Sequence, residues 1–400
     1  GLMKNENIGS NVVLIIPDEA RTFGMDPLFS EFGIYHPEGQ LYKPVDHKTL
    51  MKYKVSKNGQ IIQAGINEAG AMSTFIASAM SYSTAGIPTI PFYTFYSMFG
   101  FQRVADLIWA AADGRARGFL MGATSGRTTL NGEGLQHQDG HSLLMAHTNP
   151  AVRAWDPAFA FEISTIINHG IKEMYVENKD VIHYIALYNQ NYSMPAKPVG
   201  IDEGILKGMY LFKDNFEEMD NSDALRVQLL GSGPIMQEVL KAAEILKKKG
   251  ISTRIWSVTS YGELHREAAE YDRKCRFQGV TNLKEDSSNK NSTLPWIHKL
   301  TTPDKNKASV TIAVSDNIRA VPELIRPWVN GYYGVLGTDG FGRSDTRTAL
   351  RRFFEIDAEH IAIAAISGLV NNSEQMNKSI LLEAIQEFGI DTTRTDIASL

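Results

Sequence analysis

Apolar runs alternate with segments of helical periodicity along most of the chain. In Arg103–Arg115 the apolar residues recur at i, i+3, i+4 and i+7, and Met236–Lys248 is an amphipathic segment that Gly250 ends. Such alternation predicts an α/β fold whose sheets are parallel and carry helices on both faces. Eight apolar runs are the predicted strands: Val12–Pro17, Ile87–Phe95, Gly118–Ala123, Val181–Leu187, Val227–Gly231, Ile251–Val258, Val310–Ser315 and Tyr333–Gly337.

The composition changes over Asn189–Ile201, where asparagine, proline and glycine gather in a segment typical of a linker. A chain of 400 residues is long enough for two or three domains. We therefore expect two α/β domains, residues 1–203 and residues 204–400, each built on a parallel sheet.

Charge and composition narrow the functional classes. A net charge of −5 without a basic run argues against nucleic-acid binding. The longest apolar stretch, Ile361–Val370, is too short to cross a membrane, and the first residues do not resemble a signal peptide. The single cysteine, Cys275, cannot form an internal disulfide. These features favour a cytoplasmic protein that binds neither nucleic acid nor a membrane.

The segment 124–142 follows the apolar run Gly118–Ala123 and combines glycines with charged and imidazole side chains. Glycine lets a backbone approach a ligand closely, and loops at strand ends are the usual ligand sites of α/β sheets. A polar surface loop with glycine turns is the alternative. The residues that could carry chemistry here are Arg127, Glu133, His137, Asp139 and His141.

Asn67 is a predicted N-cap for a helix of small residues that continues to Met80, which places Glu68 in the first turn. Glu68 could simply complement the helix dipole. Alternatively, tight packing of the alanine- and glycine-rich helix buries the carboxylate and raises its pKa, which would make it a candidate for proton transfer.

Two further segments have an unusual composition. Residues 91–103 hold six aromatic side chains, which are either hydrophobic core or the wall of a site for a planar ligand. Asp18 and Glu19 directly follow the first predicted strand and belong either to an ion-pair network or to a site. The Gly231–Gly233 turn resembles a dinucleotide fingerprint but lacks its third glycine, so we interpret it as an ordinary strand–helix turn.

These segments together resemble one family. Residues 17–25, 65–71, 95–103 and 124–137 are similar to the thiamine-diphosphate-dependent first component of the bacterial pyruvate dehydrogenase complex, of the homodimeric type, and residues 335–345 extend the similarity. In that family a separate N-terminal domain holds the diphosphate and magnesium through a Gly-Asp-Gly…Asn motif, which is missing here. The resemblance therefore implies a middle, pyrimidine-binding domain followed by a transketolase C-terminal-like domain, with no metal ligand in this chain.

The resemblance also implies roles for individual residues. Glu68 corresponds to the carboxylate that bonds to the pyrimidine nitrogen of the cofactor, and Phe99 to an aromatic ring that stacks on the pyrimidine. Tyr96 would lie nearby, and Ile66 would press on the bent cofactor. His137 corresponds to a histidine that handles protons during substrate or lipoyl transfer. By the same analogy Asp18 and Glu19 line the cleft.

The implied reaction is oxidative decarboxylation of pyruvate with reductive acetylation of a lipoyl group. The implied partners are a second copy of the chain and the dihydrolipoyl acetyltransferase component. Without the diphosphate and magnesium domain, we expect the chain alone to be inactive. Two other classes stay open: a non-catalytic fragment for assembly or regulation, and another 2-oxoacid dehydrogenase or a transketolase on the same scaffold.

Overall fold

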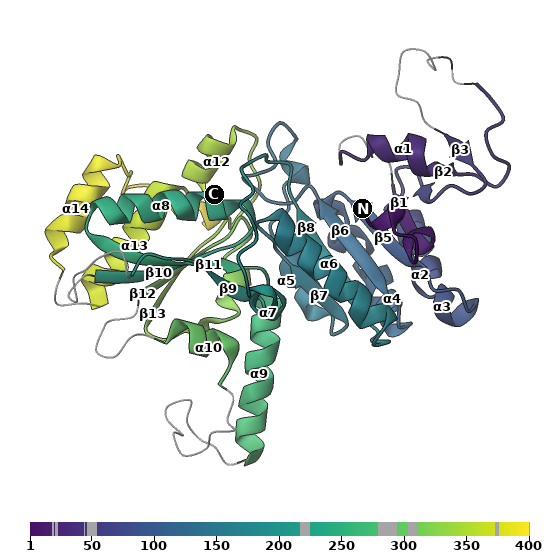
Figure 1. Cartoon of the computed structure of the whole chain (residues 1–400). Coiled ribbons are helices and arrows are strands. Elements are labelled where there is room, and N and C mark those ends of the chain that lie inside the picture. The colour runs from purple at the N-terminus through teal and green to yellow at the C-terminus, as the bar shows by residue number, and fades with distance from the viewer. Residues whose placement is uncertain are drawn as a thin grey trace. The chain divides into compact units, whose positions relative to one another are not determined.

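The computed structural model in Figure 1 divides the chain into two compact units. The first unit consists of Gly1–Ser125, Met145–Arg153 and Ile167–Asn189, and the second of Gly126–Leu144, Ala154–Ile166 and Gln190–Leu400. Asp18 and Glu19 lie outside the described residues. The structure describes residues 1–17, 20, 23–43, 45, 54–216, 225–278, 294–302, 310–372 and 376–399.

The first sheet has eight strands in the order β3-β2-β4-β1-β5-β6-β8-β7. Its central strands β1, β5, β6 and β8 run parallel and are almost wholly buried, as their continuous apolar sequences predict. The strands are β1 (Val12–Ile16), β2 (Ile34–Tyr35), β3 (Val55–Ser56), β4 (Ile61–Gln63), β5 (Ile90–Phe95), β6 (Gly118–Ala123), β7 (Val152–Trp155) and β8 (Ile182–Leu187).

Helices accompany this sheet along the chain, and α2 packs against β1, β5 and α4. The amphipathic segment predicted at 103–115 is α4, which begins two residues earlier and ends at Asp113. The helices are α1 (Asp26–Phe32), α2 (Glu68–Ala79), α3 (Ser81–Thr84), α4 (Phe101–Asp113), α5 (Ser142–Thr148) and α6 (Ala160–Tyr175).

The second sheet has five strands in the order β13-β12-β10-β11-β9. Its inner strands are parallel, but β9 runs antiparallel to β11, so the expectation of a purely parallel sheet is wrong for this unit. As an edge strand, β9 bonds to one neighbour only, and no pattern in its own residues fixes its direction. The strands are β9 (Met209–Asp214), β10 (Leu225–Gly231), β11 (Ile251–Val258), β12 (Val310–Val314) and β13 (Tyr332–Leu336).

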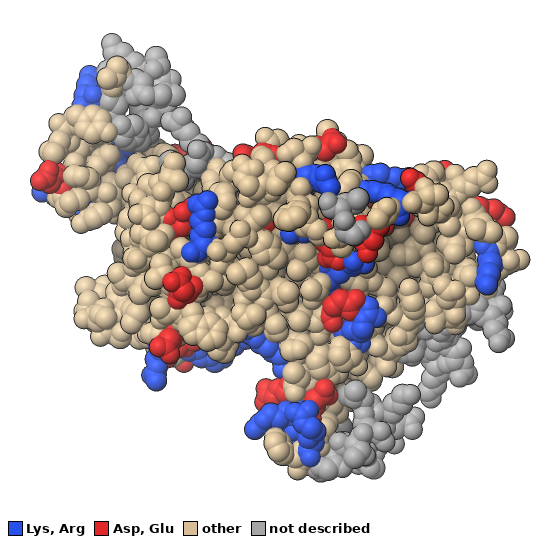
Figure 2. Space-filling model, turned by 180° about the vertical axis from the view of Figure 1, so that it is seen from behind, with Lys and Arg blue, Asp and Glu red and all other residues tan. Residues whose placement is uncertain are grey.

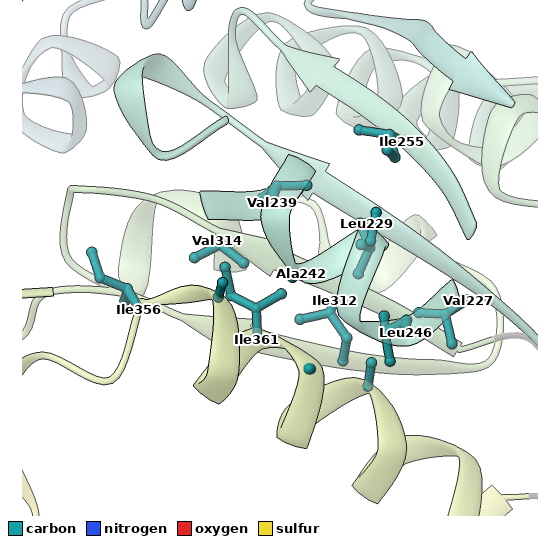
Figure 3. Packing of buried hydrophobic residues seen from close by; sticks show 14 of the residues in the cluster. Val227, Leu229, Val239, Ala242, Leu246, Ile255, Ile312, Val314, Ile356 and Ile361 are labelled. Carbon is teal, nitrogen blue, oxygen red and sulfur yellow. The ribbon is translucent and has the colours of Figure 1, made fainter. Parts of the chain in front are cut away.

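The core of the second unit lies between its sheet and the helices α8 and α13 (Figure 3). Val239, Ala242 and Leu246 of α8 recur at i, i+3 and i+7 and are fully buried, which confirms the amphipathic pattern of Met236–Lys248. The helices are α7 (Asp202–Lys207), α8 (Met236–Lys248), α9 (Tyr261–Gln278), α10 (Trp296–Thr301), α11 (Ala320–Glu323), α12 (Arg347–Phe353), α13 (Ala358–Asn372) and α14 (Lys378–Glu387).

All eight predicted strands are present, with ends that differ by at most three residues. The short strands β2, β3 and β4, together with β7 and β9, were not predicted, because two to six residues give a weak periodic signal. The predicted linker, residues 189–201, contains neither helix nor strand. The α/β fold class is confirmed.

Charged side chains of both signs are interspersed on the face shown in Figure 2. Among the helices that the structure describes, none is both long and apolar enough to span a bilayer.

Candidate functional site

Glu68 is the first residue of α2, and the local sequence explains why the helix begins there. The Asn67 side-chain oxygen accepts a hydrogen bond from the backbone N–H of Gly70 at 2.9 Å, which confirms the predicted N-cap. The Glu68 side chain is 13% exposed. The helix therefore presents a largely buried carboxylate at its positive end.

The surroundings of Glu68 are more polar than the alanine- and glycine-rich sequence predicted. Arg103 Nη1 donates a hydrogen bond to Glu68 Oε1 at 3.1 Å. The Tyr93 hydroxyl donates to the backbone carbonyl of Glu68 at 3.3 Å, and burial is the main reason that the pKa of this hydroxyl is raised. Arg103 was not predicted as a site residue, because 35 positions separate it from Glu68.

The aromatic residues of 91–103 divide into core and site. Phe95 and its neighbours on β5 are buried, so the core interpretation holds for the strand. Tyr96 and Phe99, by contrast, are half-buried, and their ring centroids lie 6.1 Å apart in an edge-to-face arrangement. Phe23 extends the cluster, with its ring centroid 5.2 Å from that of Tyr96. Arg103 links this cluster to the carboxylate, since its Cζ lies 3.9 Å from the Phe99 ring centroid.

Gly100 makes this arrangement possible. It connects the single 3-10 turn Ser97–Phe99 to α4, and a Cβ atom at this position would lie 2.0 Å from the Phe95 ring. Only glycine lets the backbone turn so close to the buried strand. As a result, Phe99 and Arg103 leave the turn within reach of the N-terminal end of α2.

Ile66 lies in the loop that precedes α2, and its residue surface is 79% exposed. Ile66 is thus far more exposed than the Glu68 side chain. Its predicted contact with a cofactor stays a prediction.

The first part of the segment 124–142 is buried, so the alternative of a polar surface loop is wrong for that part. Residues 121–130 are buried. Asp316, directly after β12, accepts hydrogen bonds from the backbone N–H groups of Thr128 and Thr129 at 2.8 and 3.0 Å and from both hydroxyl groups. Burial raises the pKa of Asp316, while these bonds lower it. Asp316 was not predicted as a site residue, and its position directly after the predicted strand Val310–Ser315 was the only sequence signal for it.

Arg127 is also buried in the second unit. It donates to the backbone carbonyl of Thr338, and a Cβ atom at Gly140 would lie 2.8 Å from its Nε. Burial lowers the pKa of Arg127, and the carboxylates of Asp139, Asp339 and Asp316 act in the opposite direction. We therefore interpret Arg127 as a structural cation that holds the segment to the second sheet.

His137 ends the short 3-10 turn Leu135–His137, and its side chain is 20% exposed. Its Nδ1 lies 3.9 Å from Glu133 Oε2. The backbone N–H of Asp139 donates to the backbone carbonyl of His137 at 3.1 Å, and the side-chain Oδ1 of Asp139 accepts from the N–H groups of His141 and Ser142. The exposed part of the segment thus carries an acid and an imidazole next to each other.

The predicted site residues are consequently found in two units. Glu68, Ile66, Tyr96 and Phe99 belong to the first unit, whereas His137 belongs to the second. Among the residues that the structure describes, no group of three or more metal-ligating side chains could hold a metal ion.

Comparison with known families matches both halves of the chain. Residues 1–195 match the model of the pyruvate dehydrogenase E1 component middle domain, and residues 208–292 match that of the transketolase-like C-terminal domain.

Three bacterial proteins with the name pyruvate dehydrogenase E1 component are similar over nearly the whole chain. The protein of Cupriavidus necator is 46% identical over 100% of this chain, that of Mycolicibacterium smegmatis 49% over 98%, and that of Escherichia coli 45% over 99%. The chain spans 43%, 40% and 43% of the length of these relatives.

Solved transketolases share the fold. The enzyme of Campylobacter jejuni has a TM-score of 0.61 at 16% identity, covering 90% of this chain and 44% of its own. The enzyme of Leishmania mexicana has a TM-score of 0.62 at 15% identity, covering 92% of this chain and 45% of its own. At these identities the similarity concerns the fold alone.

Proposed function

Since this chain belongs to the family of the pyruvate dehydrogenase E1 component, with its middle domain and a transketolase-like C-terminal domain, we propose that it forms part of a thiamine-diphosphate-dependent pyruvate dehydrogenase. The reaction would be oxidative decarboxylation of pyruvate with acetyl transfer to a lipoyl group. Because the chain spans about two fifths of its relatives, this activity concerns the complete protein.

The observation that carries the proposal is the juxtaposition of Glu68 and Phe99. Arg103 contacts both, so a carboxylate and an aromatic ring lie within the span of one planar guanidinium group. An aminopyrimidine needs the same two partners: a carboxylate for its ring nitrogen and an aromatic face for stacking. The residues of the first unit therefore fit the pyrimidine half of thiamine diphosphate.

When bound, thiamine diphosphate supplies a nucleophilic thiazolium carbon, and the protein supplies orientation and proton control. Glu68 Oε1 would hold a proton at the pyrimidine nitrogen, in a setting where water has limited access. Phe99, with Tyr96 beside it, would fix the plane of the ring, and Ile66 would limit its conformation.

The remaining assignments rest on family resemblance. His137 would move protons during substrate or lipoyl transfer, and the neighbouring Glu133 would orient its ring. Asp18 and Glu19, outside the described residues, are proposed to line the same site. The diphosphate and magnesium would be held by residues outside this chain.

We further propose that the protein acts in the bacterial cytoplasm as a homodimer with a dihydrolipoyl acetyltransferase, and that its domain boundary lies near residue 203. The alternative functions make different predictions. A non-catalytic fragment would not restore decarboxylation when the missing parts are supplied. A transketolase, or a dehydrogenase for another 2-oxoacid, would prefer a different substrate in a panel of 2-oxoacids and ketose phosphates.

The substitution Glu68→Gln tests the proposal in the complete protein. The amide keeps the size of the side chain but cannot hold a shared proton, so we expect turnover of pyruvate to fall roughly 10²–10⁴-fold. The measurement is the rate of carbon dioxide release at saturating thiamine diphosphate.

Glu203→Gln is the matched control, because Glu203 also lies in the first turn of a helix, α7, but is exposed. If Glu68 only complemented the helix dipole, both variants would retain near-normal turnover. That result would remove Glu68 from catalysis.

A further inference from the structure

Arg103 contacts both residues that the proposed cofactor ring needs. Its Nη1 lies 3.1 Å from Glu68 Oε1, and its Cζ lies 3.9 Å from the centroid of the Phe99 ring. A guanidinium group is planar and presents N–H donors at its edge, as does the aminopyrimidine ring. The guanidinium of Arg103 and the aminopyrimidine ring cannot stack on this face of Phe99 and pair with Glu68 Oε1 at the same time.

Arg103 combines a backbone that its neighbours hold in place with a side chain that is half exposed. The close approach of Gly100 to Phe95 holds the preceding turn, and the Arg103 N–H donates to the Gly100 carbonyl at 3.1 Å. The side chain, in contrast, is 50% exposed. An ion pair and a cation–π contact of this exposure together shift an equilibrium by roughly 3- to 30-fold, which binding of a larger ring can overcome.

We infer that Arg103 is an internal competitor of the cofactor's aminopyrimidine: it pairs with Glu68 and stacks on Phe99, and it must leave both before the ring binds. This inference rests on the proposed function and deepens it. The guanidinium neutralises a largely buried carboxylate. On binding, the ring nitrogen, which shares a proton with the carboxyl group of Glu68, takes the place of the guanidinium.

The competition has a measurable cost. Affinity for the cofactor is reduced by the fraction of molecules in which Arg103 covers the site, since only the uncovered form is competent to bind. Removing the guanidinium should therefore tighten binding, whereas removing an ordinary binding residue would weaken it. The direction of the effect distinguishes the two roles.

The test compares Arg103→Met, Arg103→Lys and Arg115→Met in the full-length protein that carries this chain, with magnesium present. Arg103→Met keeps much of the side-chain length but removes the positive charge and the planar guanidinium group. Arg103→Lys keeps the charge only. Arg115 is exposed and lies two residues past Asp113, where α4 ends about 15 Å along the helix from Arg103, so its variant is the control.

Titration with thiamine diphosphate in a calorimeter should show roughly 3- to 30-fold tighter binding for Arg103→Met. Arg103→Lys should give an intermediate value, because lysine can pair with Glu68 but cannot stack as a plane. Arg115→Met should match the wild type. In thermal melting, empty Arg103→Met should melt below the wild type, and saturating thiamine diphosphate should reduce that difference.

The inference is overturned if Arg103→Met binds thiamine diphosphate as tightly as the wild type or more weakly. The proposed function would still stand in that case, because the wild type binds. If neither the wild type nor any variant binds thiamine diphosphate, the proposed function fails and the inference fails with it.

Discussion

Single residues in this chain owe their properties to neighbours that are remote in the sequence. Glu68 was predicted to lie among small apolar residues, yet Arg103 on α4 pairs with it. The pKa of Glu173 depends even more strongly on such remote neighbours. Burial alone would raise the pKa of Glu173, but hydrogen bonds and charges from His183, Arg153 and Lys179 lower it to about 2.

Glu173 gives a prediction for the pH dependence of stability. Because its pKa is lower in the folded protein than the ordinary value near 4.5, its ionic contacts stabilise the fold fully above pH 4.5 and are lost as the pH falls toward 2. We expect the wild type to lose about 1–3 kcal/mol more between pH 6 and pH 3 than Glu173→Gln does. The measurement is the free energy of urea unfolding of the first unit at each pH.

Glu177→Gln is the control for this experiment. Its hydrogen bond to Lys179 also lowers the pKa of Glu177, but Glu177 is exposed and solvent screens the pair, so its variant should depart from the wild-type pH profile much less than Glu173→Gln does. Parallel profiles for the wild type and Glu173→Gln would contradict the assignment.

At the scale of elements, the ends of strands and helices position the candidate site. α2 begins at the Asn67 cap, and α4 begins after the Gly100 turn, so both helix starts carry site residues. In the second unit, Asp316 at the end of β12 holds residues 128 and 129, which precede the exposed turn with His137.

Removing the Asp316 carboxylate should destabilise the second unit. Asp316→Ala leaves two buried N–H groups and two hydroxyl groups without their acceptor, and hydrogen bonds to a charged group contribute about 1.5–3 kcal/mol each. Allowing for partial relaxation, we expect a loss of about 3–5 kcal/mol in the free energy of unfolding. Chemical denaturation followed by tryptophan fluorescence would measure it.

Asp391→Ala is a matched control, because Asp391 also accepts from the backbone and hydroxyl of a threonine, Thr393, but at an exposed site. We expect this variant to unfold at nearly the wild-type denaturant concentration. Equal effects of the two substitutions would show that burial of Asp316 does not matter.

At the scale of the whole molecule, the chain spans 40–43% of the length of its relatives. Within the first unit, Glu68 and Phe99 both contact Arg103 and fit the two partners that an aminopyrimidine needs. We therefore propose that this chain supplies the pyrimidine half of a cofactor site.

This proposal predicts that the isolated chain binds thiamine diphosphate weakly and that added magnesium does not change the affinity. The pyrimidine contacts alone would act, while the diphosphate would stay in solvent. Calorimetric titration with and without magnesium would measure this. Tight, magnesium-dependent binding would contradict the proposed division of the site.

The sequence by itself determined the local structure and the family. Continuous apolar runs indicated the buried strands, the Asn67 pattern indicated the start of α2, and the long motifs indicated the family that the comparisons then confirmed. These features depend on neighbouring residues or on similarity along the chain, so they can be read without coordinates.

Only the tertiary structure decided which side chains meet. Arg103 pairs with Glu68 across 35 positions, and Asp316 accepts hydrogen bonds from Thr128 across 188 positions. The antiparallel direction of β9 likewise depends on β11, from which other elements separate it along the chain. The periodicity of apolar residues indicates which face of one element is buried, but it does not indicate which other element packs against that face. The chemistry of the candidate site depends on those partners.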